Sequence, residues 1–113
     1  MKRPLVTLIV AFLLACTPTS APPAAHEPTV PPEAEQVVQL ARQDLATERG
    51  VSVEQVLLVS IEPRTWPDTG LGCPRAGELY AQVITPGYRL VLSDGTGQFT
   101  YHTDLRRVVK RCS

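Results

Sequence analysis

Apolar residues recur at helical spacing directly after the Pro31-Pro32 pair. Five of them occupy positions i, i+3, i+4, i+7 and i+11, which is one stripe of an amphipathic helix: Ala34, Val37, Val38, Ala41 and Leu45. Glutamates at the start and Arg49 at the end suit the helix dipole, and Gly50 is a typical residue after a helix. The pattern predicts a helix over residues 33–49, with a solvated face made of Gln39, Arg42, Gln43 and Glu48.

A strand is predicted from Val56 onward, because β-branched and aliphatic residues dominate the run. Ser52 and Gln55 have the spacing of a capping box and predict a short helical turn just before it. Within the run, alternation places three side chains toward the core: Leu57, Val59 and Ile61. Pro63 cannot donate to a ladder hydrogen bond, so it predicts an edge strand or a bulge.

Three further β-rich runs cover residues 78–85, 88–93 and 98–103. Pro86-Gly87 suits a type II turn, and Asp94-Gly95 suits a tight hairpin. Residues 106–112 form either a last short strand or a tail held by its cysteine. This order of elements predicts an α+β domain with one N-terminal helix packed on an antiparallel sheet of about four strands.

The chain has 113 residues and equal numbers of basic and acidic side chains, 11 of each. This length allows one small domain. Binding to nucleic acid is not expected, because neutralising phosphates needs clustered lysine and arginine. A core this small commonly needs a disulfide for stability, and the chain has three cysteines, an odd number.

The N-terminus has the features of an export signal. Lys2 and Arg3 precede an apolar run that ends at Ala15, and this run is too short to span a bilayer. At its end, Leu13-Leu14-Ala15-Cys16 resembles the bacterial lipobox, in which the cysteine becomes the lipidated first residue. The resemblance implies a signal peptide over residues 1–15 and a diacylglyceryl group with a further acyl chain on Cys16, which is enough for stable anchoring. An ordinary cleaved signal peptide is the alternative.

Lipidation of Cys16 would leave two thiols, Cys73 and Cys112, in an oxidising compartment, where a disulfide is expected. The protein would then lie at the cell membrane on the extracytoplasmic side. Residues 16–32 are rich in proline and predict an extended tether, and His26 within it has no expected role. The folded domain is expected to cover residues 33–113.

The segment from Trp66 to Gly77 has the least ordinary composition in the chain. Its motif Trp-Pro-Asp-x-x-Leu-Gly-Cys-Pro starts at Trp66. Further stretches are Tyr80-Ala81-Gln82, Thr85-Pro86-Gly87-Tyr88-Arg89, Tyr101-His102-Thr103 and the late Cys112. Together they resemble a family of small exported bacterial proteins without an established biochemical role. The resemblance covers about residues 36–112, and Thr69-Gly70 departs from a position that is more often serine-rich.

Two interpretations of this segment are open. In the structural one, Trp66 packs over the sheet edge, Asp68 forms an Asx turn, and Cys73 ties the loop to Cys112. In the functional one, the disulfide holds a rigid loop that binds a partner through Asp68 and through three exposed anchors, Trp66, Leu71 and Arg75.

Catalysis has little support in the sequence. His102 could work with Asp68 or Asp104 and with Ser60 or Ser93, but no nucleophile motif or metal-ligand spacing connects them. We therefore expect no enzyme activity, no catalytic residue, no metal and no cofactor. The expected function is a monomeric accessory module that binds a protein or peptide of the cell envelope. The alternative is a protease inhibitor that presents Cys73-Pro74-Arg75.

Overall fold

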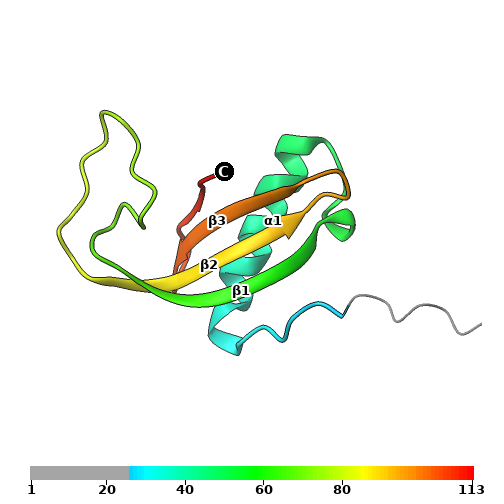
Figure 1. Cartoon of the computed structure of the whole chain (residues 1–113), viewed down its shortest axis with the longest axis horizontal. Coiled ribbons are helices and arrows are strands. Elements are labelled where there is room, and N and C mark those ends of the chain that lie inside the picture. Colours follow the sequence, from blue (N-terminus) through cyan, green and yellow to red (C-terminus); the bar gives the residue numbers. More distant parts are fainter. Residues whose placement is uncertain (1–25) are drawn as a thin grey trace, which may run out of the picture.

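The computed structural model describes residues 26–113 and contains one helix packed on one face of a four-stranded antiparallel sheet (Figure 1). The strands lie in chain order across the sheet. The elements are η1 (Pro32–Ala34), α1 (Glu35–Arg49), η2 (Val53–Gln55), β1 (Leu57–Trp66), β2 (Thr85–Ser93), β3 (Gln98–Asp104) and β4 (Val109–Arg111). The α+β class is confirmed. The expected signal peptide over residues 1–15 and the lipidation site Cys16 lie outside the described residues.

The helix buries the stripe that its sequence predicts. Its buried residues, with Ala34 just before it, are Val37, Val38, Ala41, Leu45 and Ala46. A single 3₁₀ turn precedes it, so α1 begins at Glu35. Gly50 ends it in the left-handed conformation, with φ +68°. The capping box is also confirmed. The Ser52 N–H donates to Gln55 Oε1 at 3.1 Å, and the Ser52 side chain accepts from the backbone N–H of Gln55.

The expected core positions of β1 are corrected at two residues. Leu57 and Val59 are 50% and 43% exposed, whereas Leu58 is buried. The register of β1 against β2 shifts between Leu58 and Ser60, which marks a β-bulge. An extra residue in the strand reverses the alternation, so Ile61 packs against the core as expected.

The expected strand over residues 78–85 and the expected turn at Pro86-Gly87 are wrong. Residues 67–84 form a loop, and Pro86 and Gly87 belong to β2. Pro63 pairs with Tyr88 and Thr65 pairs with Pro86, two positions apart in the same ladder. Pairs two positions apart in an antiparallel ladder are of the same kind, hydrogen-bonded or not, and proline fits the kind whose N–H groups point away from the partner strand. Both prolines can therefore lie in the ladder without removing a hydrogen bond between β1 and β2.

The two prolines also remove no hydrogen bond on the side of each strand that faces away from the β1–β2 ladder. β3 ends where Asp104 pairs with Gly87, so Pro86 lies just beyond it. β1 is an edge strand, as Pro63 predicts. Gly87 marks a close approach of β2 to β3, because a Cβ there would lie 1.7 Å from the carbonyl oxygen of Thr103.

The hairpin between β2 and β3 turns at Asp94-Gly95, as expected. The Asp94 carboxylate accepts hydrogen bonds from the Thr96 N–H and hydroxyl and from the Gly97 N–H, at 2.8–2.9 Å. Arg49 at the end of α1 donates to the same carboxylate at 2.8 Å. These donors, the Thr96 N–H foremost, hold the pKa of Asp94 far below its usual range. The turn is therefore fastened to the helix.

The segment before the helix contacts the start of β1, so contacts of the domain extend N-terminal to residue 33, where the domain was expected to begin. Glu27 accepts two hydrogen bonds from Arg42 at 2.7 and 3.1 Å and one from the Leu58 N–H at 3.0 Å. Arg42 also donates to the Val56 carbonyl at 2.6 Å, so it does not lie on a solvated face as expected. Val30 packs against the core. The folded unit therefore begins no later than Glu27.

Candidate functional site

Trp66 ends β1 on the sheet face that α1 does not cover. Its ring stacks on the His102 imidazole of β3, with ring centroids 4.3 Å apart and planes inclined by 20°. Its Nε1–H donates to the Thr103 carbonyl at 3.0 Å. Because the side chain is only 8% exposed, the expectation that Trp66 is exposed is wrong. The expected packing over the sheet is confirmed.

Leu71 is the second buried anchor of the loop, so its expected exposure is also wrong. Its side chain is 1% exposed, and its backbone is left-handed with φ +57°. The Leu71 carbonyl lies 2.7 Å from Nδ1 of His102, so this nitrogen must carry the proton and donate. Next to it, Gly72 lies flat against Trp66, and a Cβ there would be 2.8 Å from the indole ring. The loop is thus seated on Trp66 and His102.

Asp68 and Thr69 shape the loop from within. Asp68 Oδ1 accepts from the Gly70 N–H at 2.8 Å, which confirms the expected Asx turn. The two branches of the loop are joined by hydrogen bonds between Thr69 and Ala81, from the Thr69 N–H at 3.0 Å and to the Thr69 hydroxyl at 2.9 Å. The loop therefore has its own internal structure.

Cys73 and Cys112 form the expected disulfide, with their Cα atoms 5.7 Å apart. Cys112 follows β4, and its N–H donates to the Thr100 carbonyl at 2.8 Å. The disulfide thus links the loop to the β4 side of the sheet, which is the edge opposite β1.

Lys110 is a buried side chain that sequence analysis did not single out. It lies opposite His102 in the β3–β4 ladder. Its Nζ donates to the Tyr80 hydroxyl at 3.1 Å and to the Gly70 carbonyl at 3.4 Å, and lies 4.5 Å from the centroid of the Tyr80 ring. The Tyr80 hydroxyl in turn donates to Glu78 at 2.8 Å. The loop closes over this ammonium group and gains a cation–π contact from it.

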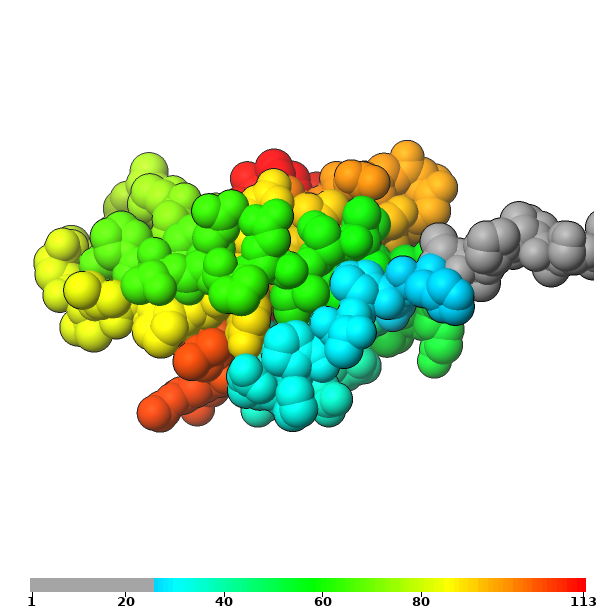
Figure 2. All heavy atoms as spheres, turned by 60° about the horizontal axis from the view of Figure 1, so that its bottom comes forward, coloured from blue at the N-terminus to red at the C-terminus, as the bar shows by residue number. Residues whose placement is uncertain are grey.

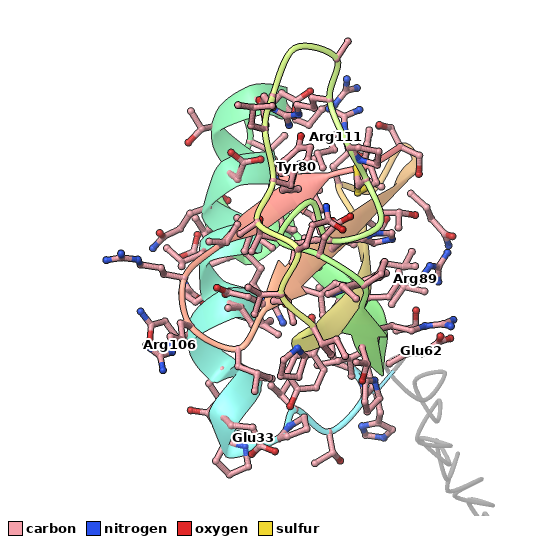
Figure 3. All side chains as sticks on the ribbon, turned by 90° about the vertical axis from the view of Figure 1, so that its left-hand side faces the viewer. Glu33, Glu62, Tyr80, Arg89, Arg106 and Arg111 are labelled. Atoms are coloured by element: carbon pink, nitrogen blue, oxygen red, sulfur yellow. A yellow bond between two sulfur atoms is a disulfide. The ribbon has the colours of Figure 1, made fainter. Side chains whose placement is uncertain are left out.

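Beyond these anchors the loop presents side chains to solvent. Leu79 is fully exposed, Val83 and Ile84 are largely exposed, and Arg75 is exposed as the sequence predicts. Figure 3 looks onto this end of the molecule, with Tyr80 inside the outline of the loop. The structure therefore separates buried anchors of the loop from an exposed tip.

Burial and a backbone carbonyl define the surroundings of the His102 ring. Burial lowers the pKa of His102, Arg89 and Arg64 lower it further, and the hydrogen bond with Leu71 opposes them. The partner of Nδ1 is a carbonyl and not the carboxylate of a catalytic triad. Among the described residues, no hydrogen bond joins His102 to any candidate partner: Asp68, Asp104, Ser60 or Ser93.

Residues 26–113 contain neither a metal-binding cluster nor a membrane-spanning helix. No three histidine, cysteine, aspartate or glutamate side chains in this part of the chain gather closely enough to hold a metal ion. The helix present there is neither long nor apolar enough to cross a membrane.

Comparison with known proteins places the chain in a family. No curated protein matches it, and no solved structure does. A family model described as "Domain of unknown function (DUF8738)" matches residues 38–112. The matched region runs from α1 to Cys112 and includes the whole sheet, the loop and both disulfide cysteines. The chain therefore belongs to the DUF8738 family.

Proposed function

We propose that the protein is a lipoprotein of the cell envelope, anchored through Cys16 on the extracytoplasmic side, and that its domain is a non-catalytic module that binds a protein or peptide partner. The Leu13-Leu14-Ala15-Cys16 motif supports the anchor. The Cys73–Cys112 disulfide supports the compartment, because disulfides persist where the surroundings are oxidising.

One observation carries the binding proposal: Leu79 is 100% exposed at the tip of a loop whose base is fixed. The tip is ordered by its own contacts, since the Arg75 N–H donates to the Tyr80 hydroxyl at 2.7 Å, and Tyr80 donates to Glu78. When an apolar side chain and an arginine project from an ordered backbone, that backbone loses little conformational entropy as a partner binds. Leu79 and Arg75 are the proposed contacts.

Trp66, Asp68 and Leu71 have a different role in this proposal. Trp66 and Leu71 are buried against the sheet, and Asp68 is hydrogen-bonded to the Gly70 backbone. They position the tip and do not touch the partner. Substituting them should weaken binding through disorder of the loop, whereas substituting Leu79 should weaken it with no loss of stability.

The experiment places a photoreactive amino acid at position 79 or, as a control, at position 57 of the full chain in living cells. Leu57 is also exposed, but it lies at the start of β1, far along the sheet from the loop. A discrete protein adduct from position 79, absent from position 57 and weakened by Arg75→Gln, is expected. Equal adducts from both positions, or none from position 79, would refute the module.

Membrane anchoring is tested separately through Cys16→Ser. The wild-type chain should fractionate with membranes, and the variant should leave them. Full retention of the variant in the membrane fraction contradicts the lipid anchor, whatever the crosslinking shows.

Protease inhibition is a second candidate, favoured by the exposure of Arg75 two residues after a disulfide-bonded cysteine. A fixed segment in a protease cleft resists turnover. A protease that cleaves after arginine should then be inhibited by the wild-type chain and not by Arg75→Gln. Rapid cleavage at Arg75 would exclude this candidate.

A further inference from the structure

A second exposed surface lies where the last residues of the loop, before β2, approach the turn between β3 and β4. We call it the apolar–basic end, and its residues are Val83, Ile84, Leu105, Arg106, Arg107 and Val108. Its four apolar side chains lie partly or largely in solvent: Val83 is 58% exposed, Ile84 72%, Leu105 40% and Val108 41%. Such a group of aliphatic side chains in solvent needs an explanation.

The two segments of the apolar–basic end are neighbours in space. One shallow hollow of about 230 Å³ is lined from β2 by Thr85 and Pro86 and from the turn by Asp104, Leu105 and Arg106. Both segments protrude at the same end of the molecule, in yellow and orange-red in Figure 2, and the first described residues lie toward the other end.

Asp104 holds the backbone of the turn that carries the basic side chains of this end. The Asp104 carboxylate accepts the backbone N–H groups of Arg106, Arg107 and Val108 at 2.8–2.9 Å. Its charge is thus directed at the backbone of the turn. Within residues 26–113 neither arginine forms an ion pair, and Arg106 stands out from the turn in Figure 3.

We propose that the apolar–basic end lies on a surface of anionic phospholipid. Aliphatic side chains flanked by arginines are the composition of interfacial membrane contacts, where the apolar groups enter the acyl boundary and guanidinium groups bind phosphates. Two adjacent arginines without an ion-pair partner among residues 26–113 give this end the charge that anionic phospholipid headgroups attract.

This inference rests on the proposed lipid anchor, which would bring the domain to a bilayer. From Cys16 to Glu27 there are eleven residues, which reach at most about 38 Å when fully extended. The ten residues of β1 span about 33 Å. An anchor of this length is long enough for the domain to rest its far end on the same bilayer.

The test reconstitutes the full chain, purified from the envelope, in vesicles that contain a trace of photoactivatable phospholipid. One set of vesicles contains phosphatidylglycerol, and the other contains phosphatidylcholine alone. After irradiation, lipid adducts are mapped by mass spectrometry. We expect adducts on residues 83–84 and 105–108, about tenfold more abundant with phosphatidylglycerol and reduced at high salt.

Matched variants separate the contribution of the arginines to lipid binding from that of the aliphatic side chains. Arg106→Gln with Arg107→Gln should remove the preference for phosphatidylglycerol, and Val83→Ser with Ile84→Ser should remove the adducts. Leu57→Ser, an exposed control at the other end of β1, should change neither. Adducts confined to the N-terminal residues, equal labelling of the 94–97 turn, or crosslinks at this end to protein or to a second copy would each overturn the inference.

Two other measurements show whether the proposed function fails. Flotation of the chain with vesicles of phosphatidylcholine alone reports the anchor, and crosslinking from position 79 in living cells reports the protein partner. Neither readout depends on adducts at the apolar–basic end.

Discussion

The indole of Trp66 stacks on the imidazole of His102, although 35 residues separate them in the chain. His102 at the same time donates to the carbonyl of Leu71, whose backbone is left-handed. One imidazole therefore supports the end of β1 and the turn of the loop above it. Because the ring is charged at low pH, this support depends on its protonation state.

Acidification should weaken the fold through His102. Burial lowers the folded-state pKa of His102 below the unfolded value of about 6.5, so the unfolded chain binds more protons in this range. The contribution of His102 to the free energy of unfolding is complete above the unfolded-state pKa. It is lost as the pH falls from the unfolded-state pKa toward the folded-state pKa. We expect the free energy of unfolding, measured with denaturant, to decrease between about pH 7 and pH 5.

Substitution identifies the residue responsible for this slope. His102→Gln should flatten the pH dependence in that window. The pKa values of Glu27 and Asp94 are also lowered by their partners, but their contributions disappear at lower pH, below the ordinary carboxylate values. An unchanged slope in the variant would contradict the assignment.

Removing the disulfide should destabilise the protein and free the loop. Cys73 and Cys112 are 39 positions apart, and closing a loop of that size restricts the unfolded chain by roughly 4 kcal/mol. Cys73→Ser should lower the melting temperature, leave Cys112 open to thiol reagents and increase proteolysis within residues 74–84. Equal melting temperatures for wild type and variant under oxidising conditions would refute this.

Glycine at position 87 should be irreplaceable. An alanine Cβ would overlap the Thr103 carbonyl oxygen, so β2 and β3 would have to separate. We expect Gly87→Ala to cost about 3 kcal/mol or more in denaturant unfolding. Gly97→Ala is the matched control, since a Cβ there meets only the Phe99 ring at an ordinary 3.8 Å. Similar costs for both variants would show that crowding at Gly87 is not the cause.

Glu27 should protect the edge of the sheet as well as stabilise it. Glu27→Ala removes the partner of Arg42 and of the Leu58 N–H, for a loss of about 1–2 kcal/mol. It also exposes edge backbone groups that can pair with another chain. We expect concentration-dependent association in analytical ultracentrifugation. Glu35→Ala, an exposed glutamate at the start of α1, should remain unchanged in both measurements.

The parts of the fold that depend on nearby residues could be predicted. The helix stripe, the capping box at Ser52 and the turn at Asp94 all arise from side chains a few positions apart. The exposure of Leu57 could not be predicted, because it depends on a bulge that is defined only against β2. The place of Pro86 in a strand depends on where β3 ends, which is also a property of the assembled sheet.

In the candidate site, too, local features could be predicted and features that depend on the assembled sheet could not. The motif that begins at Trp66 drew attention to the segment that forms the loop, and the two cysteines predicted how the loop is attached to the sheet. Burial of Trp66 and Leu71 depends on His102, which reaches them only once the sheet has formed. Lys110 was missed because its partner Tyr80 is 30 residues away, and no local pattern marks a lysine for burial.

Trp66 and Thr85 face each other as the last pair of the β1–β2 ladder, although 18 residues lie between them. The two ends of the loop thus already stand at the separation that a short reverse turn bridges. The segment between them can lengthen, shorten or change its side chains while the hairpin below keeps its register. Evolution or protein engineering can therefore replace the loop sequence while the sheet that carries it stays the same.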